Sequence, residues 1–443
     1  MTLEILVPPR AARAVKALAA LALCACSGTS GTLVVELTTA PGSQVLDPVQ
    51  HLRLTLTNPR EVVEADRSSS GFDVALEVDA KQQAGALVVE GFDASGALVA
   101  CGESPPFSVA AITAKIVVYM APPRSIAPAP VALPAALSEI SSSPLAYGAV
   151  LAGGRDGTGA PSTAISIYNA YDHTLSAGLP MPGARTQLAI GTGSSGGVYL
   201  FGGTGPDGRP TGTLWVFDST TAPSGGYLTV SETAELARTG AQIVQIGLER
   251  FLVTGAPPLT LDRGTLAARS DAAALPPAGA TLTLPDGTTS AVFAGDPILL
   301  LRDGMLEPLA TSAPAGASTA PLPGGRAVVI GGVDPALRDA LVVDGTNGNV
   351  SVIANAIATP RAHPSLAATS RYLIVAGGTD AAGAPIASAE VLDATTLAPV
   401  VTLPILARSG MFAIVLPNDQ VLLGGGAPAS NQLELFTPDP PAL

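Results

Sequence analysis

Four arginines stand at the same phase of a repeating pattern in this sequence. Each precedes, by 16 or 17 residues, a glycine that ends a short hydrophobic segment. A guanidinium can bind a carboxylate or a sugar through several donors, and it can equally donate to carbonyls of the fold itself. Two interpretations therefore stay open: the arginines form a partly basic pocket, or they hold connecting segments in place. The four are Arg185, Arg238, Arg361 and Arg408.

Aspartates follow several of the same glycines, in segments with the composition of turns. Asp156 and Asp207 each precede a glycine, and Asp380 is similarly placed. Aspartate favours turns because its carboxylate accepts hydrogen bonds from nearby backbone amides. One carboxylate per segment is too few for a calcium site. We expect these aspartates to share one face with the four arginines, and the seven residues together form the candidate binding face.

The other reactive side chains do not indicate metal or nucleophilic chemistry. The three histidines, His51, His173 and His363, occupy unrelated positions, and no spacing of His, Cys and carboxylates is typical of a metal site. No convincing helix follows a candidate Gly-x-Ser-x-Gly nucleophile motif. The sequence therefore predicts no catalytic residues, no bound metal and no cofactor.

The arginines and aspartates belong to a repeat that must position them. Hydrophobic segments ending in one or two glycines occur seven times, 36 to 53 residues apart. A second hydrophobic segment follows most of these glycines, and a short Pro-rich stretch then leads to the arginine. Such a repeat is typical of stacked units that bury their apolar faces against one another. The first glycines of the seven copies are Gly153, Gly202, Gly255, Gly295, Gly331, Gly377 and Gly424.

This pattern resembles the kelch motif, with its hydrophobic strand, double glycine and later aromatic residue. The resemblance covers residues 122–443 and implies a β-propeller of seven blades, possibly six, each a four-stranded sheet. The copies at Gly255 and Gly295 lack the second glycine, and the distal tryptophan of the motif is nearly absent. The seventh copy lacks an outer strand, and we expect residues 129–134 to supply it and so close the ring.

The N-terminus has the features of an export signal. Three basic residues precede the apolar run 17–25, which is too short to span a bilayer. The sequence Leu23-Cys24-Ala25-Cys26 resembles a bacterial lipobox, which implies a signal peptide over 1–25 and a lipid on Cys26. A tether at 26–30 would then hold an outer-membrane lipoprotein that faces the periplasm or the cell surface. Cys101 has no partner left and is expected to be a buried thiol.

A small domain is expected between the tether and the propeller. Residues 31–121 contain six or seven short strand-like segments separated by turn residues, which suits an immunoglobulin-like β-sandwich. Apolar residues make up 47% of the chain, with 48 glycines and 40 prolines dispersed among them, so the whole chain is expected to be all-β.

The net charge of −13 argues against nucleic acid as a partner. Propellers offer broad loop faces, and we expect a membrane-tethered binding scaffold for a protein or carbohydrate ligand, without catalysis. The alternative is an extracytoplasmic enzyme, either polysaccharide-acting or oxidative. Oxidative relatives on kelch scaffolds would be copper radical oxidases related to galactose oxidase, and these need a Tyr–Cys crosslink. The expected propeller contains no cysteine.

Overall fold

A computed structural model describes residues 30–32, 34–68, 71–72, 77–79, 84–108 and 115–442. The expected signal peptide and Cys26 lie outside these residues. The chain forms two units: the first contains residues up to 125 with 170–173 and 437–443, and the second contains 126–169 and 174–436. The predicted division at 121/122 stays a prediction. No described helix has the length and apolarity needed to cross a membrane.

The first unit is built on a five-stranded antiparallel sheet in the order β5-β4-β3-β8-β9. Its core side chains come from alternate positions of β3 and β8 and from the parallel pair of β2 and β11, which packs on the sheet through one hydrophobic cluster. Two packed layers of this kind agree with a sandwich, and the immunoglobulin-like label stays a prediction. The strands are β2 (Val34–Thr38), β3 (His51–Thr57), β4 (Arg60–Ser68), β5 (Gly71–Phe72), β8 (Leu87–Phe92), β9 (Leu98–Glu103) and β11 (Lys115–Tyr119).

Two further pairs complete this unit: β1 (Ser30–Thr32) with β6 (Glu77–Asp79), and β7 (Ala84–Gly85) with β10 (Phe107–Ser108). Cys101 is a buried thiol, as expected, and its Sγ donates to the carbonyl of Pro438 at 3.5 Å. The C-terminal residues 437–443 therefore belong with the small unit.

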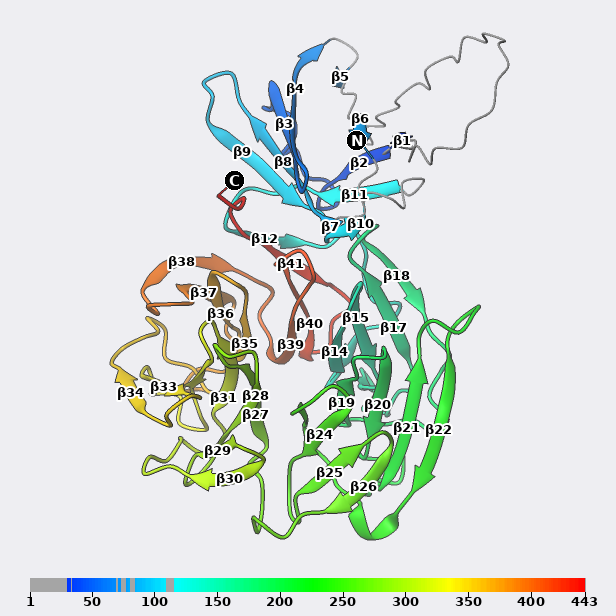
Figure 1. Ribbon diagram of the computed structural model, residues 1–443, viewed down its shortest axis with the longest axis vertical. Helices are drawn as coiled ribbons and strands as arrows, with labels where there is room; N and C mark the ends of the chain where they lie inside the picture. The colour runs from blue at the N-terminus through cyan, green and yellow to red at the C-terminus, as the bar shows by residue number, and fades with distance from the viewer. Residues whose placement is uncertain are drawn as a thin grey trace, which may run out of the picture. The chain divides into compact units, whose positions relative to one another are not determined.

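The second unit contains seven four-stranded antiparallel sheets, which we number as blades 1 to 7 (Figure 1), and a short two-stranded sheet of β13 (Leu137–Ser138) and β16 (Arg155–Asp156). Blade 1 comprises β14 (Ser141–Leu145), β15 (Gly148–Ala152), β17 (Ile165–Asn169) and β18 (Thr174–Ala177). Blade 2 comprises β19 (Ala189–Thr192), β20 (Gly197–Phe201), β21 (Thr213–Asp218) and β22 (Gly226–Glu232). Blade 3 comprises β23 (Ile243–Gln245), β24 (Arg250–Val253), β25 (Leu259–Asp262) and β26 (Thr265–Ala268).

Blade 4 comprises β27 (Ala278–Thr283), β28 (Thr289–Ala294), β29 (Leu299–Arg302) and β30 (Met305–Pro308). Blade 5 comprises β31 (Ser318–Leu322), β32 (Arg326–Ile330), β33 (Ala340–Asp344) and β34 (Val350–Ile353). Blade 6 comprises β35 (Ser365–Ala368), β36 (Tyr372–Ala376), β37 (Ser388–Asp393) and β38 (Pro399–Pro404). Blade 7 comprises β39 (Ser409–Val415), β40 (Val421–Ala427), β41 (Glu434–Thr437) and β12 (Ser125–Pro128).

The blades form a closed ring, because every innermost strand contacts the innermost strand of the next blade and β39 contacts β14. The second strand of each blade is buried along most of its length, with exposed residues such as Arg250 only at strand ends, whereas outer strands such as β18 are largely exposed. Hydrophobic clusters each join two neighbouring blades; one of them unites β15 and β17 with β20 and β21. The prediction of an all-β, seven-bladed propeller is confirmed.

The ring is closed by an early segment, close to the predicted place. The expected clasp, 129–134, lies just after the outer strand β12, which pairs with β41 in blade 7. Residues of the expected range continue this pairing: the amide of Ala129 donates to Leu433 O at 2.9 Å, and that of Leu133 donates to Asn431 O at 2.8 Å. The strand itself therefore begins four residues earlier than expected, at Ser125.

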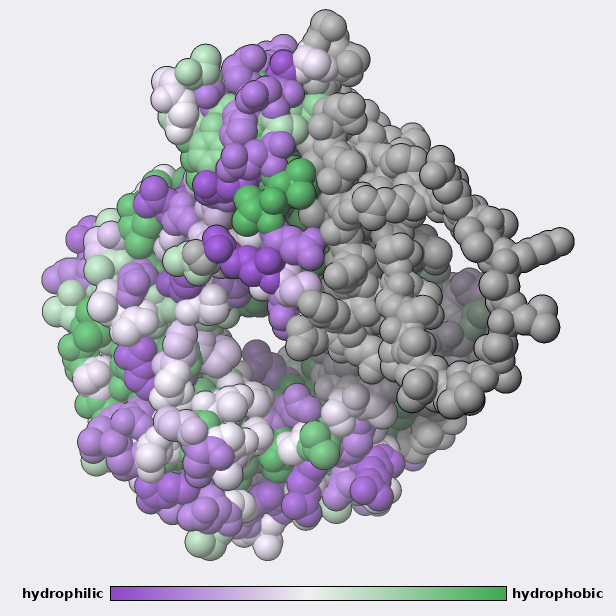
Figure 2. All heavy atoms as spheres, turned by 45° about the horizontal axis from the view of Figure 1, so that its top comes forward, coloured by the Kyte–Doolittle hydropathy of each residue, from purple (hydrophilic) through white to green (hydrophobic). Residues whose placement is uncertain are grey.

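Hydrophobic and hydrophilic residues alternate over the propeller surface seen in Figure 2, and the hydrophobic ones do not gather in one band. The largest exposed apolar side chains are likewise spread over several blades, and they include Leu248 in blade 3 and Val333 and Val352 in blade 5. Single exposed apolar residues of this kind are common on protein surfaces.

Serines at the start of inner strands connect neighbouring blades. Ser365 Oγ donates to Met411 O of blade 7 at 2.6 Å, and Ser318 Oγ makes the same bond to Pro364 O at the blade 5–6 junction. We expect Ser365→Ala to lower the free energy of unfolding by about 1 kcal/mol, because one hydrogen bond between blades is lost. Urea unfolding followed by the fluorescence of Trp215 measures this. Ser351→Ala, on the exposed outer strand β34, is the matched control and should change stability by less than about 0.5 kcal/mol.

Candidate functional site

The predicted site residues lie at one end of the blades. In an antiparallel blade, the segment between the second and third strands and the segment leading to the next blade emerge at the same end, which we call the loop face. Asp156, Asp207 and Asp380 lie in segments of the first kind, and the four arginines lie in segments of the second kind. Backbone bridges join the two kinds, for example Ser162 with Arg185 and Thr211 with Arg238.

Arg361 and Arg408 are completely buried within blades 6 and 7. Arg361 Nη1 donates to Gly377 O at 3.0 Å and to Ser388 O at 2.9 Å, while its Nη2 donates to Glu390 Oε1 at 2.8 Å. Arg408 repeats this arrangement with Gly425 O, Gln432 O and the carboxylate of Glu434. Burial lowers the pKa of Arg361, and the ion pair with Glu390 opposes that shift. These contacts favour the structural interpretation for both arginines.

Arg185 and Arg238 are half-buried, and neither forms an ion pair of this kind within the described ranges. Arg185 lies over the ring of Trp215 at 4.9 Å, and its Nη1 donates to the carbonyl of Ala184 at 2.8 Å. Arg238 Nη1 donates to Thr254 O at 2.9 Å and to Pro257 O at 3.0 Å. Burial lowers the pKa of both guanidinium groups, although the charges of Glu232 and Asp207 act to raise the pKa of Arg185. The candidate binding face around these two arginines stays a prediction.

The three aspartates of the candidate face act as turn acceptors. Asp156 Oδ1 accepts from the amides of Thr158 at 2.8 Å and Ala160 at 3.0 Å, and from the Thr158 hydroxyl at 2.6 Å. These hydrogen bonds lower the pKa of Asp156, and the bond from the Thr158 hydroxyl has the largest effect. Asp380 accepts two backbone amides in the same way, and Asp207 accepts the amide of Arg209 at 3.1 Å.

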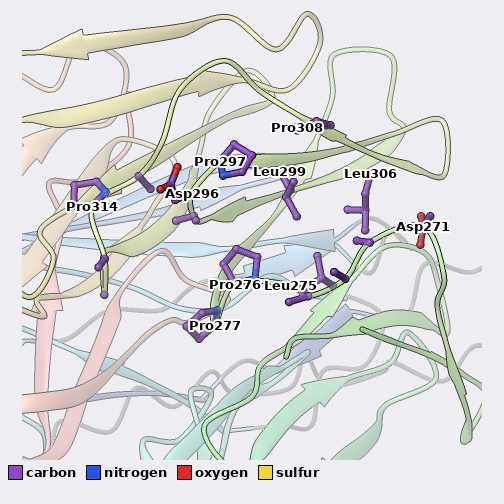
Figure 3. A pocket seen from close by; sticks show the side chains of 18 residues that line it. Asp271, Leu275, Pro276, Pro277, Asp296, Pro297, Leu299, Leu306, Pro308 and Pro314 are labelled. Atoms are coloured by element: carbon purple, nitrogen blue, oxygen red, sulfur yellow. The ribbon is translucent and has the colours of Figure 1, made fainter. Parts of the chain in front are cut away.

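A cavity of about 880 Å³ opens on the loop face around blade 4 (Figure 3). Its walls come from the segment entering blade 4, from the segment between β28 and β29, and from the segment entering blade 5. Most of the lining is Ala, Pro and Leu, and the labelled apolar side chains include Leu275, Pro276, Pro297, Leu299 and Leu306.

Two carboxylates line the cavity, and Figure 3 shows them at opposite ends. Asp271 forms an ion pair with Arg269, and this partner lowers the pKa of the Asp271 carboxyl. Asp296 Oδ1 accepts the hydroxyl of Ser312, and no described cation lies within salt-bridge distance of Asp296.

The cavity lies where the repeat lacks its arginine. The amides of Gly203 and Gly378 donate to the carbonyls of Arg238 and Arg408, at 2.9 and 3.2 Å. In the segment that enters blade 4, the matching bond runs from the amide of Gly255 to Leu275 O, at 2.9 Å. Leu275 therefore takes the arginine's backbone position, and its side chain packs in the core between blades 3 and 4.

Sequence reasoning missed Leu275, Asp271 and Asp296. The signal that could have found them is an interruption of the pattern: the copies at Gly295 and Gly331 have no arginine 16 or 17 residues earlier. The segments that enter blades 4 and 5 are the ones that line the cavity.

The propeller resembles an enzyme of known structure. A fungal alcohol oxidase of the AA5 family, solved in complex with copper and described as having catalytic diversity among that family, matches with a TM-score of 0.55. The match covers 70% of this chain and 75% of that chain, at 14% sequence identity. The likeness is one of fold. No protein-family model matches the sequence, and no curated protein matches it.

This comparison contradicts the expectation of a binding scaffold without catalysis. The matching propeller belongs to an enzyme, so the prediction that this protein is not an enzyme is wrong by that finding. The alternative, an enzyme on a propeller scaffold, is better supported. The expectation of no catalysis was based on the absence of motifs known from other enzymes. An active site of different composition need not contain those motifs.

The residues of this chain do not fit the copper of the matching enzyme. No group of three or more His, Cys, Asp and Glu side chains in the described ranges could hold a metal ion. The second unit contains no cysteine, and its histidine, His363, is exposed on the segment entering blade 6. Copper ligation draws on imidazole and sulfur donors, which the blade 4 cavity does not offer.

Proposed function

We propose that this protein is an extracytoplasmic enzyme on a propeller scaffold, which binds a hydroxyl-bearing alcohol or polysaccharide substrate in the blade 4 cavity. The proposal includes an outer-membrane location through a lipid on Cys26. The similarity to the fold of the alcohol oxidase supports the proposal that this protein is an enzyme. The cavity supports the proposed location of the substrate site. Ligand sites in proteins are commonly concave and mostly apolar, with a few polar groups that fix orientation.

The observation that carries the proposal is the Asp296 carboxylate at the edge of an apolar cavity. Its Oδ1 accepts the Ser312 hydroxyl, which orients the carboxylate, and its Oδ2 can accept a substrate hydroxyl. A carboxylate placed in this way can take the hydroxyl proton as a general base. The rings of Pro276 and Pro297 offer apolar surface for the carbon skeleton. No step is assigned to copper, because its donors are missing from the cavity.

Turnover assays on the purified chain, kept in mild detergent, test this function. One arm supplies primary alcohols and neutral sugars together with a soluble two-electron acceptor such as a quinone and measures reduction of the acceptor; the other supplies polysaccharides and measures new reducing ends. We expect turnover in one arm. Asp296→Asn should lower kcat by about 100-fold or more, the usual contribution of a general base.

Asp303→Asn is the matched control, because Asp303 is an exposed aspartate in the β29–β30 turn of the same blade. It should leave turnover unchanged. Full activity of Asp296→Asn, or no turnover in either arm by a correctly folded protein, would contradict the proposed function.

A further inference from the structure

We propose that the blade 4 cavity recognises an ammonium or guanidinium group of its ligand, which takes the position that the repeat's arginine takes in other blades. This inference rests on the proposed function, since it names the substrate class of the same cavity. It concerns binding, however, and binding can be measured apart from turnover.

The other blades show what this position of the fold binds. In blade 3, Nη1 of Arg238 donates to the carbonyls of Thr254 and Pro257, and its Nε donates to Leu236 O. In blades 6 and 7, Nη1 of Arg361 and of Arg408 likewise donates to two carbonyls, and each guanidinium meets a carboxylate as well. A guanidinium beside carbonyls and a carboxylate is therefore a recurring feature of this propeller.

Blade 4 keeps the acceptors and lacks the arginine. The sequence Gly255-Ala256-Pro257 of blade 3 corresponds to Gly295-Asp296-Pro297 of blade 4. By this correspondence we assign to the carbonyls of Ala294 and Pro297 the role that those of Thr254 and Pro257 have toward Arg238; the ring of Pro276 packs beside them, against Gly295. Leu275, in the arginine's backbone position, is buried in the core of blades 3 and 4.

Asp296 adds a negative charge where blade 3 has Ala256. The carboxylate lies in the cavity lining and accepts a hydrogen bond from the neutral hydroxyl of Ser312. Asp296 is exposed, whereas Glu390 is buried; a cationic ligand group that covers Asp296 would pair with it as Arg361 pairs with Glu390 in blade 6. Hydrogen bonds between charged partners are about twice as strong as neutral ones, so a cation is favoured over an uncharged group of the same size.

The apolar walls define the remainder of the ligand. Pro276, Pro297 and Leu299 line the space beside Asp296 and Pro314 (Figure 3). A short carbon chain or a ring can cover these side chains while its basic group reaches the acceptors. An amine or guanidine with a small apolar body, or an amino sugar unit, has this chemistry.

Binding of n-butylguanidinium, n-butylammonium and 1-butanol to the purified chain tests the inference by calorimetry at 150 mM NaCl. We expect the two cations to bind at least about tenfold more tightly than 1-butanol, which corresponds to the strength of one charged hydrogen bond. Asp296→Asn should remove this preference, and Asp303→Asn should retain it. Equal binding of the alcohol and the cations would overturn the inference, as would equal losses in the two variants.

Leu275→Arg provides a second, independent variant. If the new guanidinium is held as Arg238 is in blade 3, it will occupy the position proposed for the ligand's cation and abolish cation binding. If this variant does not fold, the Asp296→Asn and Asp303→Asn pair still decides the question. Cation binding without turnover would support the inference and contradict the proposed function. Turnover of uncharged substrates without a preference for cations would support the proposed function and contradict the inference.

Discussion

Arg361→Ala should lower the free energy of unfolding by about 3–5 kcal/mol, the usual cost of leaving one member of a buried ion pair alone. Arg361 has no exposed surface, and Glu390 is 2% exposed. The substitution removes the cation from Glu390 and removes donors from the carbonyls of Gly377 and Ser388. Urea unfolding followed by Trp215 fluorescence measures the change.

Two comparisons isolate the cause of this loss. Arg250→Ala breaks an ion pair with Asp262 whose side chains are 61% and 49% exposed, so it should cost at most about 1 kcal/mol. The double variant Arg361→Met with Glu390→Leu removes both charges and should be more stable than Arg361→Ala, because no buried charge is left unpaired. If Arg361→Ala is no more destabilising than Arg250→Ala, the arginine is not a structural element of blade 6.

The blades could be predicted because glycine marks them. Gly377 has φ +59°, and a Cβ there would lie 2.4 Å from Arg408 O, so only glycine fits between adjacent segments. This requirement recurs with the fold, and the sequence therefore displays the repeat directly. The clasp was placed a few residues late, because the Pro-rich stretch 122–134 has no alternation that fixes a strand boundary.

The partners of the arginines could not be predicted with the same ease. Glu390 lies 29 residues after Arg361, inside the hydrophobic third strand of blade 6. A single carboxylate in such a strand is expected to point to solvent. The sheet register brings it inward against the arginine. The phase of Arg361 was visible in the sequence, but its burial depends on pairings between strands that are distant along the chain.

The cavity could not be predicted because it lies where the repeats of blades 4 and 5 lack the arginine. Leu275 and Pro314 are ordinary apolar residues in sequence, and nothing in their types indicates a site. The missing arginine marks the interrupted repeats in the sequence, but the backbone bond from Gly255 to Leu275 is needed to show which residue takes its position. The same absence of a recognisable motif led to the wrong expectation that the protein lacks catalysis.

The stability of the first unit should fall by about 3 kcal/mol between pH 7 and pH 4 through His173 alone. His173 is 2% exposed and lies 5.7 Å from the ring of Tyr119, and burial lowers the pKa of its imidazole to about 4, partly opposed by Asp172. The unfolded chain binds a proton near pH 6.5, whereas the folded chain binds it only near pH 4. Between these values the unfolded state holds more protons, so stability is full above pH 6.5 and is lost as the pH falls.

His173→Asn separates this contribution from that of the other titrating groups. His173 has φ +53°, a conformation that asparagine tolerates better than most residues, and asparagine does not titrate. Urea unfolding followed by circular dichroism at pH 7, 5.5 and 4.5 should show a steeper loss of stability in the original protein than in the variant. Parallel curves would mean that the His173 imidazole reaches solvent or a proton acceptor in the folded state, and that its burial does not hold it neutral.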